Sequence, residues 1–177
     1  MKMDISPNFT PRSQQLIVES KLLAVSLNHK EVTADHLLIS VLRSDGGFIR
    51  EFINGFGLSA DKFVEFIITY SSLDKRDQEI TGCSYAASFK EALTESHTFS
   101  TKLGHSYIGV EHLFFVLINL TESSSSNFFY SENISPSQIM ETFLLGLRAQ
   151  ELVRETKKAA VTESMLDRLR SRPTPQP

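Results

Sequence analysis

The chain has 177 residues, of which 41% are hydrophobic, and its net charge is -3. This length and apolar share support one domain with a sizeable core, and the mixed charge offers no basic surface for nucleic acid. The single cysteine, Cys83, excludes an internal disulfide, and no Cys/His spacing indicates structural zinc. No apolar stretch approaches the roughly 20 residues that span a bilayer, and the first residues lack a signal-peptide segment. We therefore expect a cytoplasmic protein that binds neither membrane nor nucleic acid.

The first predicted helix begins at Pro11 and ends near Leu27. Thr10 precedes it as a typical N-cap, and proline loses nothing at the first helical position, where its missing N–H would have no partner. The residues expected on the buried face recur at helical spacings. They are Leu16, Ser20, Leu23, Ala24 and Leu27.

A second helix is predicted over residues 34–43, with Thr33 as its N-cap and Asp35 in the first turn, where the helix dipole favours a negative charge. The pair Gly46-Gly47 then interrupts the chain. A short third helix through residues 48–53, closed by Gly55 and Gly57, and a fourth over 60–70, capped by Ser59, complete the unit.

A second unit follows a polar connector over residues 72–84. Helices are predicted over about 86–103 and 110–120, and a last one begins at Pro136 after Ser135 as cap. The serine-rich segment 121–127 is predicted to be a loop.

Three further segments flank the two units. Residues 1–8 form an N-terminal arm, residues 150–170 keep a helical pattern without a counterpart in the first unit, and the Pro-rich residues 171–177 are expected to be disordered. The 150–170 helix either packs on its own domain or docks on a partner or a second copy.

The two units are copies at an offset of 76 residues. Leu27-Asn28-His29 returns as Leu103-Gly104-His105, and residues 32–37 (VTADHL) return as residues 108–113 (IGVEHL). Apolar residues replace one another at the matching core positions, which indicates a shared core. The expected fold is all-α, a pseudo-two-fold duplicated four-helix repeat over residues 9–149 (9–71 and 85–149) with a C-terminal helical extension.

These motifs resemble the double-repeat N-terminal domain of the Clp/Hsp100 unfoldases. The resemblance rests on Phe9-Thr10-Pro11-Arg12, on residues 27–38, and above all on residues 103–113 (LGHSYIGVEHL), and it covers about 9–147. It implies a module that receives substrates and adaptors ahead of an ATPase ring. No GxxxxGK[ST] phosphate loop occurs in the chain, so no ATPase activity is expected.

The function implied by the resemblance is therefore binding without catalysis and without a cofactor. The chain would serve as an accessory, adaptor or regulator of a Clp chaperone-protease, with a Clp ATPase, a Clp protease subunit or client proteins as partners. The alternative is a structural or scaffold protein that self-associates, or binds another partner, through the C-terminal helix. A third hypothesis, an enzyme that pairs Cys83 with His105, lacks a third orienting residue.

In some family members, residues at the positions of Thr10, Asp35 and Glu111 bind phosphoarginine, and the resemblance implies the same candidate peptide or phosphoarginine site here. A helix N-terminus offers N–H groups to an anion, and a carboxylate can bind a guanidinium through two hydrogen bonds. In the second copy Ala86 replaces the threonine, and Asp35 is one methylene shorter than the usual glutamate. The competing interpretation is that both acids simply stabilise the first turns of their own helices.

Two other residue groups admit a functional and a structural interpretation. A metal site built from the histidines is not favoured, because an adjacent acid and histidine on one helix point about 100° apart. The many phenylalanines are expected in the core rather than in a ligand site. The histidines concerned are His29, His36, His105 and His112.

Overall fold

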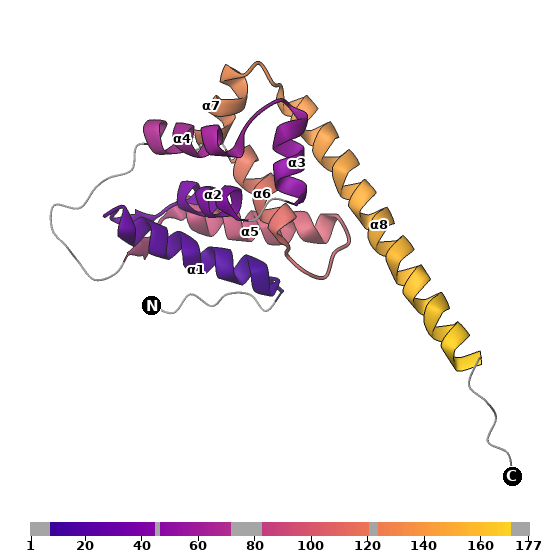
Figure 1. Ribbon diagram of the computed structural model, residues 1–177. Helices are drawn as coiled ribbons and strands as arrows, with labels where there is room; N and C mark the ends of the chain where they lie inside the picture. Colours follow the sequence, from indigo (N-terminus) through magenta and orange to yellow (C-terminus); the bar gives the residue numbers. More distant parts are fainter. Residues whose placement is uncertain (1–7, 45–46, 72–82, 121–123, 171–177) are drawn as a thin grey trace, which may run out of the picture. The chain divides into compact units, whose positions relative to one another are not determined.

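The computed structural model describes residues 8–44, 47–71, 83–120 and 124–170 (Figure 1). Residues 1–7 of the expected N-terminal arm, most of the connector (72–82) and the C-terminal tail (171–177) lie outside these residues. Within them the chain is almost entirely helical, with one two-stranded pair, β1 (Glu31–Val32) and β2 (Ser84–Tyr85). The helices are α1 (Pro11–Ser26), α2 (Ala34–Arg43), α3 (Phe48–Gly55), α4 (Ala60–Tyr70), α5 (Ala87–Lys102), α6 (Val110–Asn119), α7 (Ser124–Ser131) and α8 (Pro136–Arg170).

The 76-residue offset holds for the helix boundaries themselves. The first and last residues of α5, α6 and α7 lie 76 positions after those of α1, α2 and α3, and α8 begins 76 positions after α4. The duplicated all-α fold is confirmed.

The same offset governs the left-handed turns of the described chain. Asn28 and Gly104 follow the first helix of each repeat with φ of 57° and 76°, and Gly57 and Asn133 end the third helix with φ of 72° and 58°. Glycine and asparagine adopt this conformation most readily, so each repeat needs one of them at both turns.

The segment that leads into the first helix of each repeat contacts the other repeat. The segment before α1 lies against the segment before α6, with Phe9 bridging Ile108 and the Thr10 N–H donating to the Ile108 carbonyl at 3.0 Å. Likewise β2, which leads into α5, pairs in parallel with β1, which leads into α2, and the Ala86 N–H donates to the Val32 carbonyl at 2.9 Å. The first helix of each repeat therefore begins against the second helix of the other.

The core of the first compact unit, residues 1–136, centres on α2 and α6. Every residue of α2 from Ala34 to Leu42 is buried, as is every residue of α6 from His112 to Ile118. Helices α1 and α5 pack on α2 and α6 with one face each and expose the opposite face to solvent. Of the five residues expected on the buried face of α1, three are fully buried and two partly. The buried three are Leu16, Ser20 and Ala24.

Aromatic side chains join the two repeats. Phe63 of α4 stacks on Phe128 of α7, with ring centroids 4.1 Å apart, and Phe52 of α3 meets Phe114 of α6 edge to face at 5.6 Å. Such pairs contribute about 0.5–1.5 kcal/mol beyond the area they bury. These four phenylalanines are buried, as expected for core residues.

The loop predicted over residues 121–127 is wrong from residue 124 onward. Ser124 begins α7, and residues 121–123 lie outside the described part of the chain. A run of serines favours a loop because it brings little apolar surface to a core. However, Ser125 is fully buried and its hydroxyl donates to the Leu117 carbonyl at 3.1 Å, which ties this serine to α6.

The second unit, residues 137–177, consists in its described part of α8 alone. Residues 150–170 belong to the same helix that begins at Pro136, without a break. The distal part of α8 exposes several large apolar side chains, namely Leu152, Val153, Val161, Met165 and Leu166. Among the described residues, no helix combines the length and apolar character that crossing a bilayer requires.

Candidate binding edges at the helix N-termini

Thr10 stands where the N-termini of α1 and α6 adjoin. Its hydroxyl oxygen accepts from the Ser13 N–H at 3.2 Å, which confirms the predicted N-cap. The Ser13 hydroxyl donates to the Ile108 carbonyl at 3.0 Å, and the same carbonyl accepts from the Thr10 N–H. We call Thr10, Ile108, Gly109 and Glu111 the Thr10 edge.

Glu111 folds back over the start of its own helix. Its side chain is 13% exposed, and a Cβ built on Gly109 would overlap its carboxylate. The absence of a side chain at Gly109 therefore leaves the space in which the Glu111 carboxylate lies, close to the positive end of α6. In the first repeat Thr33 and Asp35 occupy the equivalent positions, so a larger cap residue accompanies a shorter acid.

Asp35 interacts with the other repeat. Its carboxylate oxygens accept from the Ser124 hydroxyl at 3.0 Å and from the Ser124 N–H at 3.3 Å, so Asp35 caps α7. Burial raises the pKa of the Asp35 carboxyl, although both hydrogen bonds from Ser124 favour the ionised form. We call Val32, Asp35, Ala86 and Ser124 the Asp35 edge.

The three candidate residues do not form one cluster. Thr10 and Glu111 lie on the Thr10 edge. Asp35 follows the turn at the far end of α1, a helix of 16 residues and hence about 24 Å long. In the second repeat Ala86 occupies the N-cap position of α5 without a side-chain hydrogen bond. The Thr10 edge thus keeps both the threonine and the longer acid, whereas the Asp35 edge has neither.

A pair of histidines stands beside each edge. His36 Nε2 lies 2.8 Å from His29 Nδ1, and His112 Nε2 lies 2.7 Å from His105 Nδ1. In each repeat the second histidine also accepts from the N-cap N–H through Nδ1, at 2.9 Å from Thr33 and 2.8 Å from Gly109. Each pair closes the loop that leads into α2 or α6.

These contacts fix the tautomers. Because His36 Nδ1 accepts from a backbone N–H, its Nε2 carries the proton and donates to His29 Nδ1. A proton added to Nδ1 of His36 would face the Thr33 N–H. Burial, and then the neighbouring His29, lowers the pKa of His36 to about 4. His36 is therefore neutral at pH 7.

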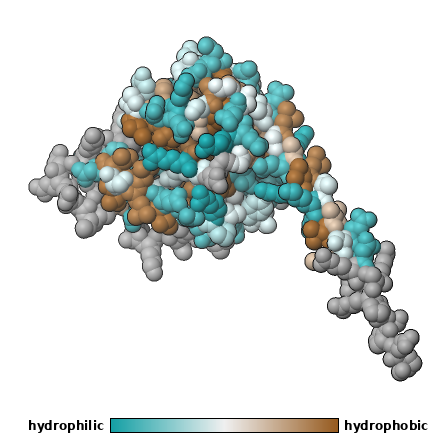
Figure 2. Space-filling view, in the orientation of Figure 1, coloured by the Kyte–Doolittle hydropathy of each residue, from teal (hydrophilic) through white to brown (hydrophobic). Residues whose placement is uncertain are grey.

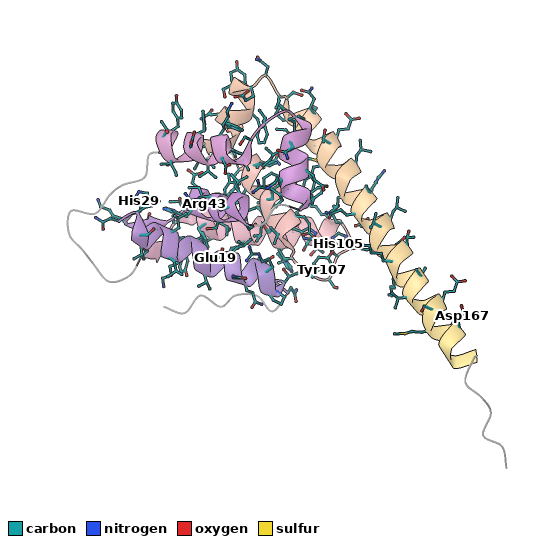
Figure 3. All side chains as sticks on the ribbon, viewed as in Figure 1. Glu19, His29, Arg43, His105, Tyr107 and Asp167 are labelled. Carbon is teal, nitrogen blue, oxygen red and sulfur yellow. The ribbon has the colours of Figure 1, made fainter. Side chains whose placement is uncertain are left out.

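The described residues hold no group of three or more His, Cys, Asp or Glu side chains placed to bind a metal ion. Cys83 donates from Sγ to the His29 carbonyl at 3.1 Å. Figure 3 labels His29 and His105 at opposite ends of the helical bundle, so the structure does not form the Cys83–His105 pair that the enzyme hypothesis requires.

Sequence reasoning missed the contacts between the repeats. The sequence indicates Asp35 only as a ligand residue or as a first-turn charge, because the loop predicted over residues 121–127 offers no helix start for it to cap. Phe48 begins the third helix of the first repeat, and the 76-residue offset from it predicts a helix start at Ser124. This signal could have indicated that the N-terminus of α7 needs a capping residue.

The Clp repeat (R) N-terminal domain family matches the sequence twice, over residues 8–132 and 84–165. Curated relatives include the chaperone protein ClpB of Oceanobacillus iheyensis, 27% identical over 81% of this chain and 17% of the relative. The ATP-dependent Clp protease ATP-binding subunit ClpC of Staphylococcus epidermidis is 23% identical over 85% of this chain and 18% of its own length. The chain thus spans about a sixth of these relatives.

Among solved structures, a ClpV N-domain in complex with a VipB peptide has a similar fold. Its TM-score is 0.63 at 18% identity, and the match covers 84% of this chain and 94% of that one. Together with the two family matches over the duplicated helices, the chain belongs to the Clp repeat (R) N-terminal domain family.

Proposed function

We propose that this chain is a non-catalytic protein-binding module of the cytoplasm that acts as accessory, adaptor or regulator of a Clp chaperone-protease. The observation that carries the proposal is the Thr10 edge, where two helix N-termini adjoin beside Thr10 and Glu111. The positive end of a helix and a nearby carboxylate together suit a ligand with an anionic and a guanidinium end. The relatives, which include a Clp protease subunit and a peptide-bound N-domain, support the same class of function.

The proposed ligand of the Thr10 edge is a client segment that carries phosphoarginine. The phosphate would lie at the start of α1, near the Thr10 hydroxyl, and Glu111 would receive the guanidinium. The Asp35 edge would not bind it, because Ser124 occupies the Asp35 carboxylate and Ala86 lacks a hydroxyl.

Isothermal titration with a phosphoarginine peptide tests this assignment. We expect one site per chain, weakened at least tenfold by Thr10→Ala or by Glu111→Gln, and unchanged by the matched variant Ala86→Ser on the other edge. Two equal sites, or full affinity in Glu111→Gln, would contradict the assignment.

The Clp connection has its own test. The purified chain is added to a Clp ATPase, its protease core and a fluorescent client, and client degradation and ATP hydrolysis are followed. A change in either rate that saturates with the chain is expected. If neither rate changes and the chain binds none of the three components in sedimentation, the accessory role is wrong.

A scaffold function is the second candidate. The observation in its favour is the row of exposed apolar side chains on α8 beyond Gln150, which a helical partner or a second copy could cover. Sedimentation equilibrium of the full chain and of a form truncated after Gln150 decides it. A concentration-dependent dimer that the truncation abolishes would support the scaffold, and a monomer in both would reject self-association.

A further inference from the structure

Helix α1 presents an apolar row to solvent. Val18, Leu22 and Val25 are 54%, 63% and 44% exposed, and their spacings of four and three residues place them on one face. We call these three residues the α1 stripe. Figure 2 shows hydrophobic colouring at the lower left of the molecule, over the part of α1 that leads to His29.

The second repeat provides an internal comparison. The residues of α5 at the same positions, 76 further on, are Thr94, Thr98 and Thr101. Their hydroxyls donate to the carbonyls four residues earlier, at 3.1, 3.2 and 2.9 Å. The fold therefore accepts a polar row in this place. Folding alone gives no reason for three exposed apolar residues on α1, because threonine and valine have similar helix propensity.

The size of the α1 stripe limits what can cover it. Val18 and Val25 are seven residues apart, or about 10 Å along the helix. A stable dimer interface uses about 20–30 residues from each partner, so three side chains are too few to hold a second copy. Two turns of a helix with apolar residues at positions i, i+3 or i+4, and i+7 match this length.

The charged residues beside the α1 stripe indicate which charge a partner should carry next to its apolar face. The Glu19 carboxylate already receives the Arg12 guanidinium at 3.7 Å and the Gln15 amide at 2.8 Å. The Lys21 ammonium lies 5.7 Å from the centre of the Tyr85 ring. This leaves a positive charge beside an apolar row and favours an acidic residue on the partner.

We infer that the α1 stripe docks a short amphipathic helical segment of another protein, with an apolar face and an acidic flank. This inference rests on the proposed protein-binding function but uses a surface other than the Thr10 edge. A failure here leaves phosphoarginine binding at Thr10 and Glu111 untouched, and the loss of that binding leaves the α1 stripe untouched.

The probe is a synthetic 15-residue acetylated peptide with leucines on one helical face and glutamates on the other. Two peptides serve as comparisons, one with the same composition but scattered leucines and one with lysine in place of each glutamate. Binding to the full ¹⁵N-labelled chain is followed by amide chemical shifts and by titration calorimetry. We expect shifts along α1, and at least tenfold weaker binding of the scattered peptide.

The repeats supply matched variants. Val18→Thr, Leu22→Thr and Val25→Thr together copy α5 and are expected to weaken binding at least tenfold while thermal unfolding stays cooperative. The reciprocal Thr94→Val, Thr98→Leu and Thr101→Val add a second row, so the stoichiometry should rise from one peptide to two. This gain remains informative even if the first variant fails to fold.

Four results would overturn the inference. They are no binding of the leucine-faced peptide, equal affinity in the threonine variant, tighter binding of the lysine peptide, or a dimer in sedimentation that the threonine variant abolishes. The last result would assign the α1 stripe to a second copy of the chain.

Discussion

The carboxylate of Asp35 in α2 caps α7 through Ser124, a residue 89 positions later in the chain. This contact joins the start of a helix in one repeat to the start of a helix in the other. It also explains how a buried carboxylate, whose pKa is raised by burial, is kept in the core: both of its oxygens accept hydrogen bonds.

Asp35→Ala is expected to lower the free energy of unfolding by about 1–3 kcal/mol, because α7 loses its cap and the Ser124 N–H loses its acceptor. Urea unfolding followed by circular dichroism measures the change. In Asp35→Asn the side chain keeps one acceptor oxygen, so the loss should be smaller. An Asp35→Ala variant as stable as the wild type would show that the contact does not hold α7.

The neutral imidazole of His36 makes the fold sensitive to acid. The pKa of His36 falls from an ordinary 6.5 to about 4 in the folded state, so between these values the unfolded chain binds more protons. Stability from this group is therefore complete above about pH 6.5 and is lost progressively as the pH falls to 4, by roughly 3 kcal/mol. Melting temperatures between pH 7.5 and 4.5 should decrease accordingly.

Asp35 affects the pH dependence of stability in the opposite direction. Its pKa is raised above 3.8, so the folded state takes up its proton first and gains stability as the pH falls toward that value. His36→Gln isolates this contribution, since glutamine does not titrate. The variant should lose less stability than the wild type between pH 6.5 and 4. Parallel curves for the two proteins would reject the histidine assignment.

Gly109→Ala tests whether the missing side chain at Gly109 is what allows the Glu111 carboxylate to fold over the start of α6. The new methyl group would meet the carboxylate, which is the far end of a flexible side chain, so stability should change by less than about 1 kcal/mol. The carboxylate should instead move outward, visible in a crystal structure of the variant. The double variant Gly109→Ala, Glu111→Asp should avoid the displacement, because the first repeat combines a larger cap with aspartate. An unmoved Glu111 in the single variant would contradict this account.

The left-handed turns predict unequal effects of substitution at equivalent positions. Gly104→Ala should destabilise the protein by about 1 kcal/mol, because φ is 76° there. Asn28→Gly, at the same place in the first repeat, should change stability little, since glycine accepts φ of 57° without strain. Chemical denaturation of the two variants checks both expectations. Equal losses would mean that side-chain contacts rather than backbone conformation decide these sites.

The sequence predicted the helices of the first repeat within a residue or two, because each one carries its own local boundary signals. Thr10-Pro11 marks the start of α1, and glycines bracket α3. The repeated His-containing motifs gave the duplication, and the structure extends the same 76-residue offset to helix ends and left-handed turns.

Contacts between residues far apart in the sequence could not be predicted in this way. Nothing local to Asp35 indicates that its partner lies in α7, and nothing local to Thr10 indicates that its N–H bonds to Ile108. The exposure of Val18, Leu22 and Val25, in contrast, agrees with the buried face predicted for α1, which leaves these three residues out.

The reciprocal contacts at the starts of α1 and α5 make the fold equivalent to a symmetric dimer whose two subunits are joined in one chain. In each repeat the N–H of the N-cap residue before the first helix donates to a carbonyl of the other repeat, that of Ile108 in one case and of Val32 in the other. Half of the gene expressed alone would lack that partner and would recover it by pairing with another copy of itself. The covalent link between the halves is what allows them to differ, with threonine and glutamate at one edge, alanine and a serine-bound aspartate at the other.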